Sequence, residues 1–372
     1  LWDEPTLFHS FDQHDKPTVN AFKIWNWMIN HPQAEIKDVP MKKWSVPVVI
    51  KNEVSTNFVK FTSKVVTRQD SARDDTVKLL IELQDGHHIE TVIMKHQGRV
   101  TVCVSSQIGC KMGCKFCATG TMGIIGDLTA GEIIEQLMHA SMIAKVRNVV
   151  FMGMGEPLNN FENVKLAVQF MTDPRRFGLS PRHVTVSTVG VVNSMYRLTR
   201  ELPAVSLALS LHAPTQDIRL KIVPAASAHP IEKLMDAIDN HISCRVAAGG
   251  EAGNKKDAMV MIEYILIKDV NDRTEHAHQL AALLAPRREF IILNIIPYNP
   301  TEVAEDFHPP TEEQIEKFFR TCANPPYLLH TRRRREMGQD IDGACGQLAV
   351  VHRDNGSVTG GDIEDIASKK KT

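Results

Sequence analysis

The spacing of apolar residues divides the chain into stretches that predict different structures. In residues 1–50, the side chains of Phe22, Trp25 and Ile29 recur at the spacing of an α-helix. This pattern predicts a small helical accessory domain at the N-terminus, with the aromatic side chains in its core.

In residues 51–97 the apolar residues recur at a shorter spacing. Three runs rich in β-branched and aromatic residues, separated by polar turn signals, predict strands at 58–62, 76–83 and 89–94. We interpret this region as a small β-meander that leads into the next domain.

Residues 98–350 repeat a strand-then-helix pattern. Six nearly apolar runs predict strands at 100–104, 148–152, 183–187, 205–209, 259–267 and 291–296. Helical spacing follows each run, over 130–144, 161–171, 193–200, 216–222 with 231–242, 274–284 and 311–321. Buried strands that alternate with helices indicate a parallel sheet. We therefore predict an α/β fold with a partial (β/α)6 barrel, and an open doubly wound sheet is the alternative.

Composition narrows the class of protein. The 372 residues are 43% hydrophobic, which is enough for a sizeable core, and the net charge of −1 gives no global attraction to nucleic acid or a membrane. No apolar run is long enough to span a bilayer. Seven unevenly spaced cysteines argue for a reducing compartment and against a secreted disulfide framework. We expect a cytoplasmic location; because the chain starts at Leu1, import into an organelle stays open.

The C-terminal residues 351–372 are mostly polar and contain three consecutive lysines directly before Thr372. Such a composition cannot bury enough apolar surface to fold, so we predict a disordered tail.

Four of the seven cysteines fall within residues 103–117. Three of them, Cys110, Cys114 and Cys117, are spaced Cys-x3-Cys-x2-Cys, a clustering that requires a chemical reason. Iron–sulfur clusters usually take four thiolates, so three would leave one iron open to substrate. Unrelated buried thiols, or a zinc knuckle completed by a distant His or Cys, are the alternatives.

Small and polar residues gather where the predicted strands end. The carboxyl ends of parallel strands share one face of a barrel or sheet, and that face carries the active site. The runs that follow the strands are Gly153-Met-Gly155-Glu156-Pro157, Ser187-Thr188, Ser210-Leu211-His212 and Pro297-Tyr-Asn299-Pro300. A single Gly-x-Gly turn or a lone histidine there is ordinary, but the whole set beside the cysteines predicts an active site.

Two further stretches follow the last strand–helix unit. Residues 332–335 are four consecutive arginines, which form either a solvated face or a set of phosphate contacts. Cys345 lies between Ala344 and Gly346, where a thiol can be approached closely. Cys244 and Cys322 match no motif, and we expect them to be structural thiols.

Taken together, these motifs resemble the RlmN/Cfr group of radical S-adenosylmethionine (SAM) RNA adenosine methyltransferases. The triplet of cysteines alone is typical of all radical SAM enzymes, and the likeness runs from about Lys16 to Ala349. The narrower resemblance depends on Cys103-Val-Ser-Ser-Gln-Ile-Gly-Cys110, Gly153-Met-Gly-Glu-Pro-Leu, Ser210-Leu-His-Ala-Pro, Ile296-Pro-Tyr-Asn-Pro and Asp340-Ile-Asp-Gly-Ala-Cys-Gly-Gln-Leu.

The resemblance implies a [4Fe-4S] cluster on the three spaced cysteines and two SAM molecules per turnover. One SAM would methylate the sulfur of Cys345, and the second, bound by the residues at the strand ends, would yield the radical that activates this methyl group. The residues that the resemblance implies as contacts of this cofactor are Gly155, Glu156, Ser187, Ser210, Leu211, His212 and Asn299. After the carbon adds to adenine, Glu90 would accept a proton. Cys103 would then attack the sulfur of Cys345, form a disulfide and release 2-methyladenosine.

The resemblance also implies partners. The substrate would be an adenosine of large-subunit rRNA or of tRNA, and the electron donor would be a flavodoxin- or ferredoxin-type protein, with no membrane involved. Methylation at carbon 8, as in Cfr, is one alternative, and a non-catalytic RNA-binding protein with a structural metal site is another. The loop over 240–257 is longer than in typical bacterial members, which could alter the RNA that is admitted.

Overall fold

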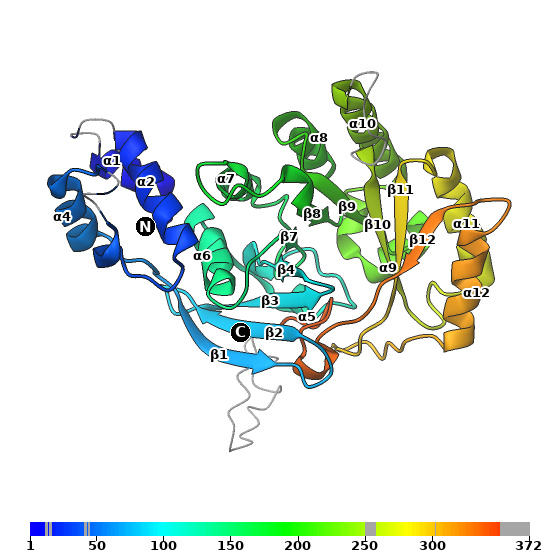
Figure 1. Ribbon diagram of the computed structural model, residues 1–372. Helices are drawn as coiled ribbons and strands as arrows, with labels where there is room; N and C mark the ends of the chain where they lie inside the picture. Colours follow the sequence, from blue (N-terminus) through cyan, green and yellow to red (C-terminus); the bar gives the residue numbers. More distant parts are fainter. Residues whose placement is uncertain are drawn as a thin grey trace, which may run out of the picture.

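The structure, a computed structural model, describes residues 1–11, 14, 17–40, 43, 45–249, 258–301 and 303–349. Within these residues one sheet of ten strands runs in the order β1-β2-β3-β4-β7-β8-β9-β10-β11-β12, and β5 and β6 form a separate ribbon (Figure 1). The tail predicted at 351–372 lies outside the described residues, as does most of the second half of the loop predicted at 240–257.

The first part of the sheet is antiparallel. Its strands are β1 (Lys64–Asp70), β2 (Thr76–Glu82), β3 (His88–His96) and β4 (Arg99–Cys103). The strands predicted at 76–83 and 89–94 are confirmed, whereas the strand predicted at 58–62 is wrong. There the Lys60 ammonium donates to the carbonyls of Pro32 (2.5 Å) and Ala34 (2.8 Å), so the segment is tied to the helical unit and not to a neighbouring strand.

The second part of the sheet is parallel. It contains β4, β7 (Asn148–Phe151), β8 (Val184–Thr188), β9 (Ser206–Ser210), β10 (Val260–Leu266), β11 (Ile291–Pro297) and β12 (His330–Arg333). The six predicted strands and the α/β class are confirmed. β12 was not predicted, because its sequence is His-Thr-Arg-Arg. A charged strand of this kind suits the edge of a sheet, where it discourages pairing with another chain.

Helices follow the parallel strands around the outside of the sheet (Figure 1). They are α6 (Ala130–Ser141), α7 (Phe161–Thr172), α8 (Val192–Glu201), α9 (Gln216–Ile222), α10 (Ile231–Gly249), α11 (Thr274–Leu284) and α12 (Glu312–Ala323), with short 3-10 turns at Ile36–Asp38, Pro181–His183, Pro224–Ser227, Ala285–Arg287 and Gln339–Ile341. Capping boxes at Thr129 and Thr311 start α6 and α12. α10 extends beyond its predicted end and carries Cys244 on its exposed face, whereas Cys322 of α12 is fully buried.

The N-terminal unit is helical as predicted. It contains α1 (Glu4–Phe11), α2 (Pro17–Asn30) and α4 (Val48–Asn57), so helical structure continues past the boundary expected at residue 50. Trp25 is fully buried and packs against the rings of Phe8, Phe22 and Phe170, which confirms a core role for these aromatic residues. The domain boundaries at 50, 97 and 350 stay predictions.

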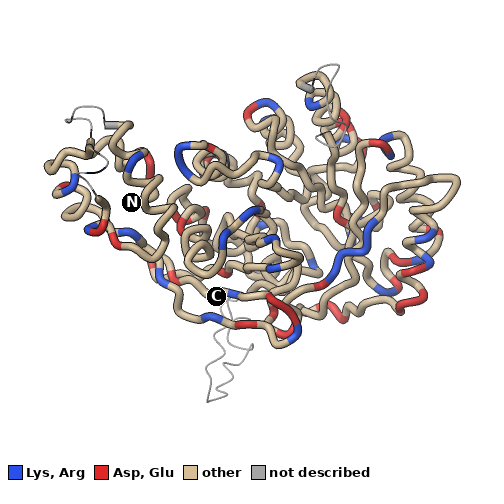
Figure 2. The backbone as a smooth tube through the Cα atoms, in the orientation of Figure 1, with Lys and Arg blue, Asp and Glu red and all other residues tan. Residues whose placement is uncertain are grey.

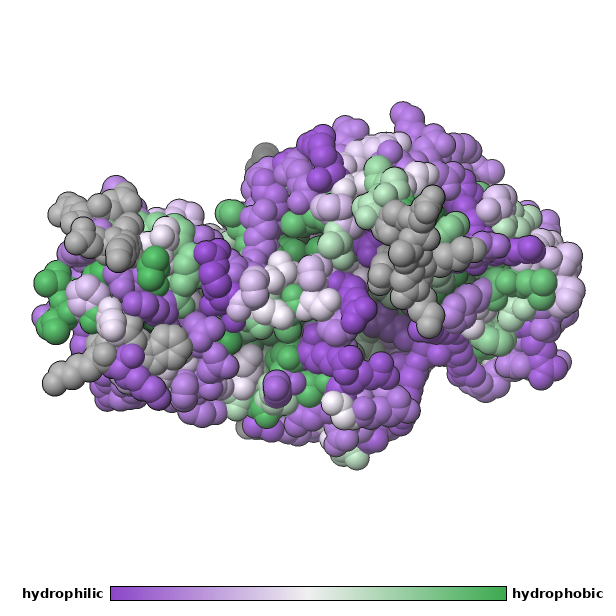
Figure 3. All heavy atoms as spheres, turned by 45° about the horizontal axis from the view of Figure 1, so that its top comes forward, coloured by the Kyte–Doolittle hydropathy of each residue, from purple (hydrophilic) through white to green (hydrophobic). Residues whose placement is uncertain are grey.

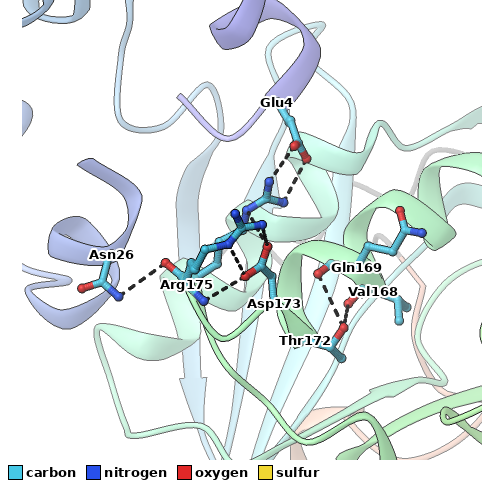
Figure 4. Close-up of polar contacts among 8 residues, drawn as sticks. Glu4, Asn26, Val168, Gln169, Thr172, Asp173 and Arg175 are labelled. Atoms are coloured by element: carbon cyan, nitrogen blue, oxygen red, sulfur yellow. Dashed lines mark hydrogen bonds and ion pairs between the residues drawn. The ribbon is translucent and has the colours of Figure 1, made fainter. Parts of the chain in front are cut away.

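Polar contacts fasten this unit to the end of α7. The guanidinium of Arg176 donates to both carboxylate oxygens of Glu4, at 2.6 and 2.9 Å. Asn26 donates to the carbonyl of Arg175, whose side chain pairs with Asp173 (Figure 4). The unit nevertheless projects from the main body as a separate lobe (Figures 1 and 3). Within the described residues, no helix combines the length and the apolar character that crossing a membrane requires.

Candidate active site

The three spaced cysteines lie on one loop beyond the carboxyl end of β4. The ribbon of β5 (Gln107–Cys110) and β6 (Gly123–Asp127) fixes the start of this loop, and the short helix α5 (Ala118–Thr121) follows it. Cys110, Cys114 and Cys117 line one cavity in the middle of the parallel strands. The structure thus brings the three cysteines to one cavity, and their role as cluster ligands stays a prediction.

The surroundings of the loop fit an anionic iron–sulfur cluster. Across the described residues, no group of three or more His, Cys, Asp or Glu side chains is arranged to hold a metal ion. The observation that fits a cluster is Arg219 of α9. It is fully buried, its guanidinium donates to the carbonyls of Leu211, His229 and Val189, and no carboxylate in the described part of the chain pairs with it.

Burial lowers the pKa of Arg219 to about 10, and Cys114 is the group that opposes this effect. A buried charge is costly unless it is compensated. The negative charge of a thiolate-held cluster would compensate it, so the donor set and its surroundings both fit the group.

The loop after β7 packs directly against the loop after β4. A Cβ at Gly155, where φ is +95°, would lie 2.5 Å from the Cβ of Gln107, so this position requires glycine. The next carboxylate, that of Glu156, is 3% exposed and accepts the N–H groups of Leu158 and Val189, both at 2.9 Å. Burial raises the pKa of Glu156 to about 7. Such a group favours a cationic partner in the cavity that it lines.

Residues after β8 and β9 complete this cavity. The hydroxyl oxygens of Ser187 and Ser210 lie 3.4 Å apart, and both side chains line it. Nδ1 of His212 accepts the N–H of Ile265 (3.1 Å), and burial lowers the pKa of His212 to about 3, so the ring is neutral. Leu211 is different, because its fully buried side chain packs in the main core and does not line the cavity.

A second, smaller cavity adjoins the first. Cys103 and Asn299 line the second cavity only, whereas Cys345 lines both. Asn299 Nδ2 donates to the backbone carbonyl of Cys345 (3.1 Å), and the N–H of Ala118 donates to the carbonyl of Gly346 (2.8 Å). The structure thus brings together two thiols from distant parts of the chain, and it holds the segment of Cys345 against the cysteine loop.

In the second cavity, burial and nearby charged groups alter the pKa of Cys103. Its side chain is 7% exposed, and burial raises its pKa to about 12. The neighbouring Cys345 adds to this rise and Arg334 opposes it. All seven cysteines are free thiols in the structure.

The position of Arg334 is not apparent from the sequence. The run 332–335 looks uniform in sequence, and Figure 2 shows it as a continuous basic stretch at β12. In the structure its members differ: Arg333 pairs with Glu312 of α12, whereas Arg334 lines both cavities. Strand alternation could have hinted at this difference, but β12 itself was not predicted.

Glu90 occupies a different place from the other predicted site residues. It lies on β3, is 3% exposed and pairs with Lys78 Nζ at 2.9 Å, but it lines neither of the two cavities. Burial raises its pKa, and Lys78 opposes the rise. Lys78 also donates to the carbonyl of Asp342 (3.3 Å), which links Glu90 to the segment that carries Cys345.

Comparisons with known proteins agree with this arrangement. Residues 104–281 match the Radical SAM superfamily. The probable dual-specificity RNA methyltransferase RlmN of Shouchella clausii is 37% identical over 335 residues, which cover 88% of this chain and 89% of the relative. The probable dual-specificity RNA methyltransferase RlmN of Enterococcus faecalis is 36% identical over 345 residues, which cover 91% and 92%.

Among solved structures, a radical SAM methyltransferase from Sphaerobacter thermophilus superposes with a TM-score of 0.81 at 34% identity, covering 92% of this chain and 96% of that one. Sequence identity at this level over nearly the whole of both chains establishes common membership. The chain therefore belongs to the RlmN family of radical SAM RNA methyltransferases.

Proposed function

We propose that this protein methylates carbon 2 of an adenosine in RNA, with Cys345 as the residue that carries the methyl group. The observation that carries the proposal is the position of Cys345, which lines the cysteine-lined cavity on one side and the cavity of Cys103 on the other. The relatives are named dual-specificity RNA methyltransferases, and adenosines of large-subunit rRNA and tRNA are the substrates that we propose. The free thiols suit the reducing cytoplasm.

The larger cavity would hold the cofactors. Cys110, Cys114 and Cys117 would bind a [4Fe-4S] cluster, which together with SAM supplies a 5′-deoxyadenosyl radical and the methyl group. Two SAM molecules would be used per turnover, and a flavodoxin- or ferredoxin-type protein would deliver electrons. The residues that would contact SAM are Gly155, Glu156, Ser187, Ser210, Leu211, His212 and Asn299. Of these, Asn299 lines the smaller cavity only, and Leu211, which lines neither cavity, would act through its backbone.

The thiols of the chain have separate roles. The Cys345 sulfur first accepts a methyl group. The methyl carbon then loses one hydrogen atom to the 5′-deoxyadenosyl radical and bonds to carbon 2 of adenine. The adduct gives up the carbon 2 proton and one electron, and this electron would return to the oxidised cluster. The Cys103 thiolate then attacks the Cys345 sulfur, and the sulfur–carbon bond breaks. The electron pair of that bond and one proton go to the carbon, which becomes the methyl group of the product, while the two sulfurs are oxidised to a disulfide. A dithiol reductant must reduce this disulfide before the next turnover.

Glu90 would accept the proton that adenine loses. Burial raises its pKa, which suits a carboxylate that takes up a proton. Glu90 lies outside both cavities, and Lys78 connects it to the Cys345 segment through the carbonyl of Asp342.

A trapping experiment tests the proposal. A Cys103→Ala protein with its cluster, incubated with SAM, a reductant and RNA, should accumulate a covalent RNA adduct at Cys345 that mass spectrometry detects. Cys244→Ala, which removes an exposed thiol on α10, should turn over normally. The double variant Cys103→Ala/Cys345→Ala should form no adduct. If Cys103→Ala forms no adduct under conditions where the wild-type protein turns over, the assigned roles of both thiols are wrong.

Analysis of the RNA product separates the related activities. Nucleoside mass spectrometry against standards should identify 2-methyladenosine. If it identifies 8-methyladenosine, the site of methylation is carbon 8 and not carbon 2. A protein that binds RNA but leaves it unmodified, with zinc in place of iron, would refute catalysis altogether.

A further inference from the structure

We propose that Arg334 is a positioning residue that stabilises two thiolates in turn, that of Cys345 when it accepts the methyl group and that of Cys103 when it attacks the Cys345 sulfur. The inference rests on the proposed function and deepens it, because it assigns a charge to the step in which the two thiols meet. Arg334 acts through the two cysteines.

The position of Arg334 supports this role. Four residues line both cavities: Met152, Ile296, Arg334 and Cys345. Within the described residues, Arg334 is therefore the charged side chain at the junction between the cavities, next to the one thiol that must work in both. The other two members are apolar, so the junction contains little else that could stabilise an anion.

Contacts fix the position of the Arg334 guanidinium but use only some of its N–H donors. The backbone N–H of Arg334 donates to the carbonyl of Ile295 (2.9 Å), which continues the pairing of β12 with β11. Nη1 lies 3.5 Å from Oε2 of the buried Glu263 and 3.7 Å from the sulfur of Met152. Glu263 Oε1 in turn accepts from Asn294 Nδ2 (2.8 Å). An arginine has five N–H donors, and in the described part of the chain these two contacts leave most of them available.

Cys103 needs such a charge. The thiolate and not the thiol is the nucleophile, and burial raises the pKa of Cys103 to about 12. The ionisable groups that face it are Cys345, which raises the pKa further, and Arg334, which lowers it. Arg335 and Glu336 line the same cavity. Because arginine stays protonated at every pH of interest, its effect does not depend on a second titration.

The order of the chemical steps explains how one cation can serve two thiols. Before methylation, Cys345 is the group with the largest effect on Arg334, whose pKa it raises. Once methylated, Cys345 is a neutral thioether. Its charge then no longer competes, so the guanidinium becomes available to the Cys103 thiolate.

Substitutions of Arg334 test this inference. Arg334→Gln and Arg334→Met both remove the charge. Because two neutral variants are used, the test still works if one of them fails to fold. Arg334→Lys keeps the charge. Arg333→Gln is the matched control, because its side chain pairs with Glu312 on α12 and lines neither cavity. Iron and sulfide content should equal that of the wild-type protein in each variant used.

Two rates are measured on the cluster-loaded proteins: methylation of Cys345 from isotopically labelled SAM, by mass spectrometry, and release of RNA from the adduct in a chase. Loss of the charge should slow both by about tenfold or more, a barrier change of about 1.4 kcal/mol. Arg334→Lys should recover most of each rate, and Arg333→Gln should match the wild-type protein. The slow release of the neutral variants should also increase about tenfold for each rise of one pH unit, since the Cys103 thiolate is scarce below the pKa of the thiol.

The inference is overturned if either rate stays at the wild-type value in the neutral variants, or if Arg334→Lys is as slow as they are. These outcomes differ from a failure of the proposed function. In that case Cys103→Ala would give no adduct at all, whereas a failure of the Arg334 inference alone leaves that adduct intact.

Discussion

Glu156→Gln should make the SAM-free protein more stable at alkaline pH and less able to bind SAM. The Glu156 carboxylate is buried, and its pKa is raised from 4.5 to about 7. A group whose pKa is higher in the folded than in the unfolded chain destabilises the fold once it ionises. The penalty is absent below about pH 4.5, grows as pH rises towards 7, and is complete above that value.

The size of the stability change follows from the difference between the folded and the unfolded pKa of Glu156. The rise in pKa corresponds to about 3 kcal/mol near pH 8 and to less than about 1 kcal/mol near pH 5. Glutamine removes the charge, but its amide group cannot accept both the Leu158 and the Val189 N–H groups, which costs about 1 kcal/mol. We therefore expect a gain of about 2 kcal/mol near pH 8 and little change or a slight loss near pH 5.

The assay is urea unfolding of the cluster-loaded, SAM-free protein at both pH values, without oxygen. Glu232→Gln, at an exposed position in the first turn of α10, is the control and should change stability by only about a few tenths of a kcal/mol. SAM affinity, measured by equilibrium dialysis, should fall by about tenfold or more in Glu156→Gln alone. An equal stability change at both pH values, or destabilisation near pH 8, would refute the reasoning.

Three further substitutions test other contacts of the fold. Arg219→Gln should lower iron retention and make the reduction potential of any remaining cluster more negative, as measured by iron analysis and by a redox titration followed by EPR. Gly155→Ala should abolish most SAM binding because its Cβ has no space, whereas Gly86→Ala, at a similar φ in open space, should only lower stability by about 1 kcal/mol. Glu4→Gln should expose the N-terminal lobe to limited proteolysis, because it leaves the buried guanidinium of Arg176 without its bidentate partner.

Much of the fold could be predicted because the relevant signals are local. A buried parallel strand is largely apolar, so β7 to β11 could be predicted from composition and spacing. The same rule missed β12, which borders β11 alone and has two arginines among its four residues. The false strand at 58–62 came from its β-branched and aromatic residues, but there the apolar side chains pack on the core without forming a ladder.

The site was predictable only in part, for a related reason. Cys110, Cys114 and Cys117 are close in sequence, and their spacing alone indicates a shared ligand. No local pattern shows that Cys103 and Cys345 line one cavity, because their approach depends on the sheet order and on the path of residues 334–346 back across it. That link came from a family resemblance, as did the role of Glu90, which the structure places outside both cavities.

The edge strand β12 connects these observations. Its parallel pairing with β11 brings residue 334 to the carboxyl edge of the sheet, where the Glu263 carboxylate receives the guanidinium. From there the chain passes the second cavity and reaches Cys345, which Asn299 holds through its backbone carbonyl. A shift of β12 by one residue would turn Arg334 away from the cavities and replace it with a neighbouring arginine. The register of β12 on β11 therefore determines which of four adjacent arginines meets the two thiols.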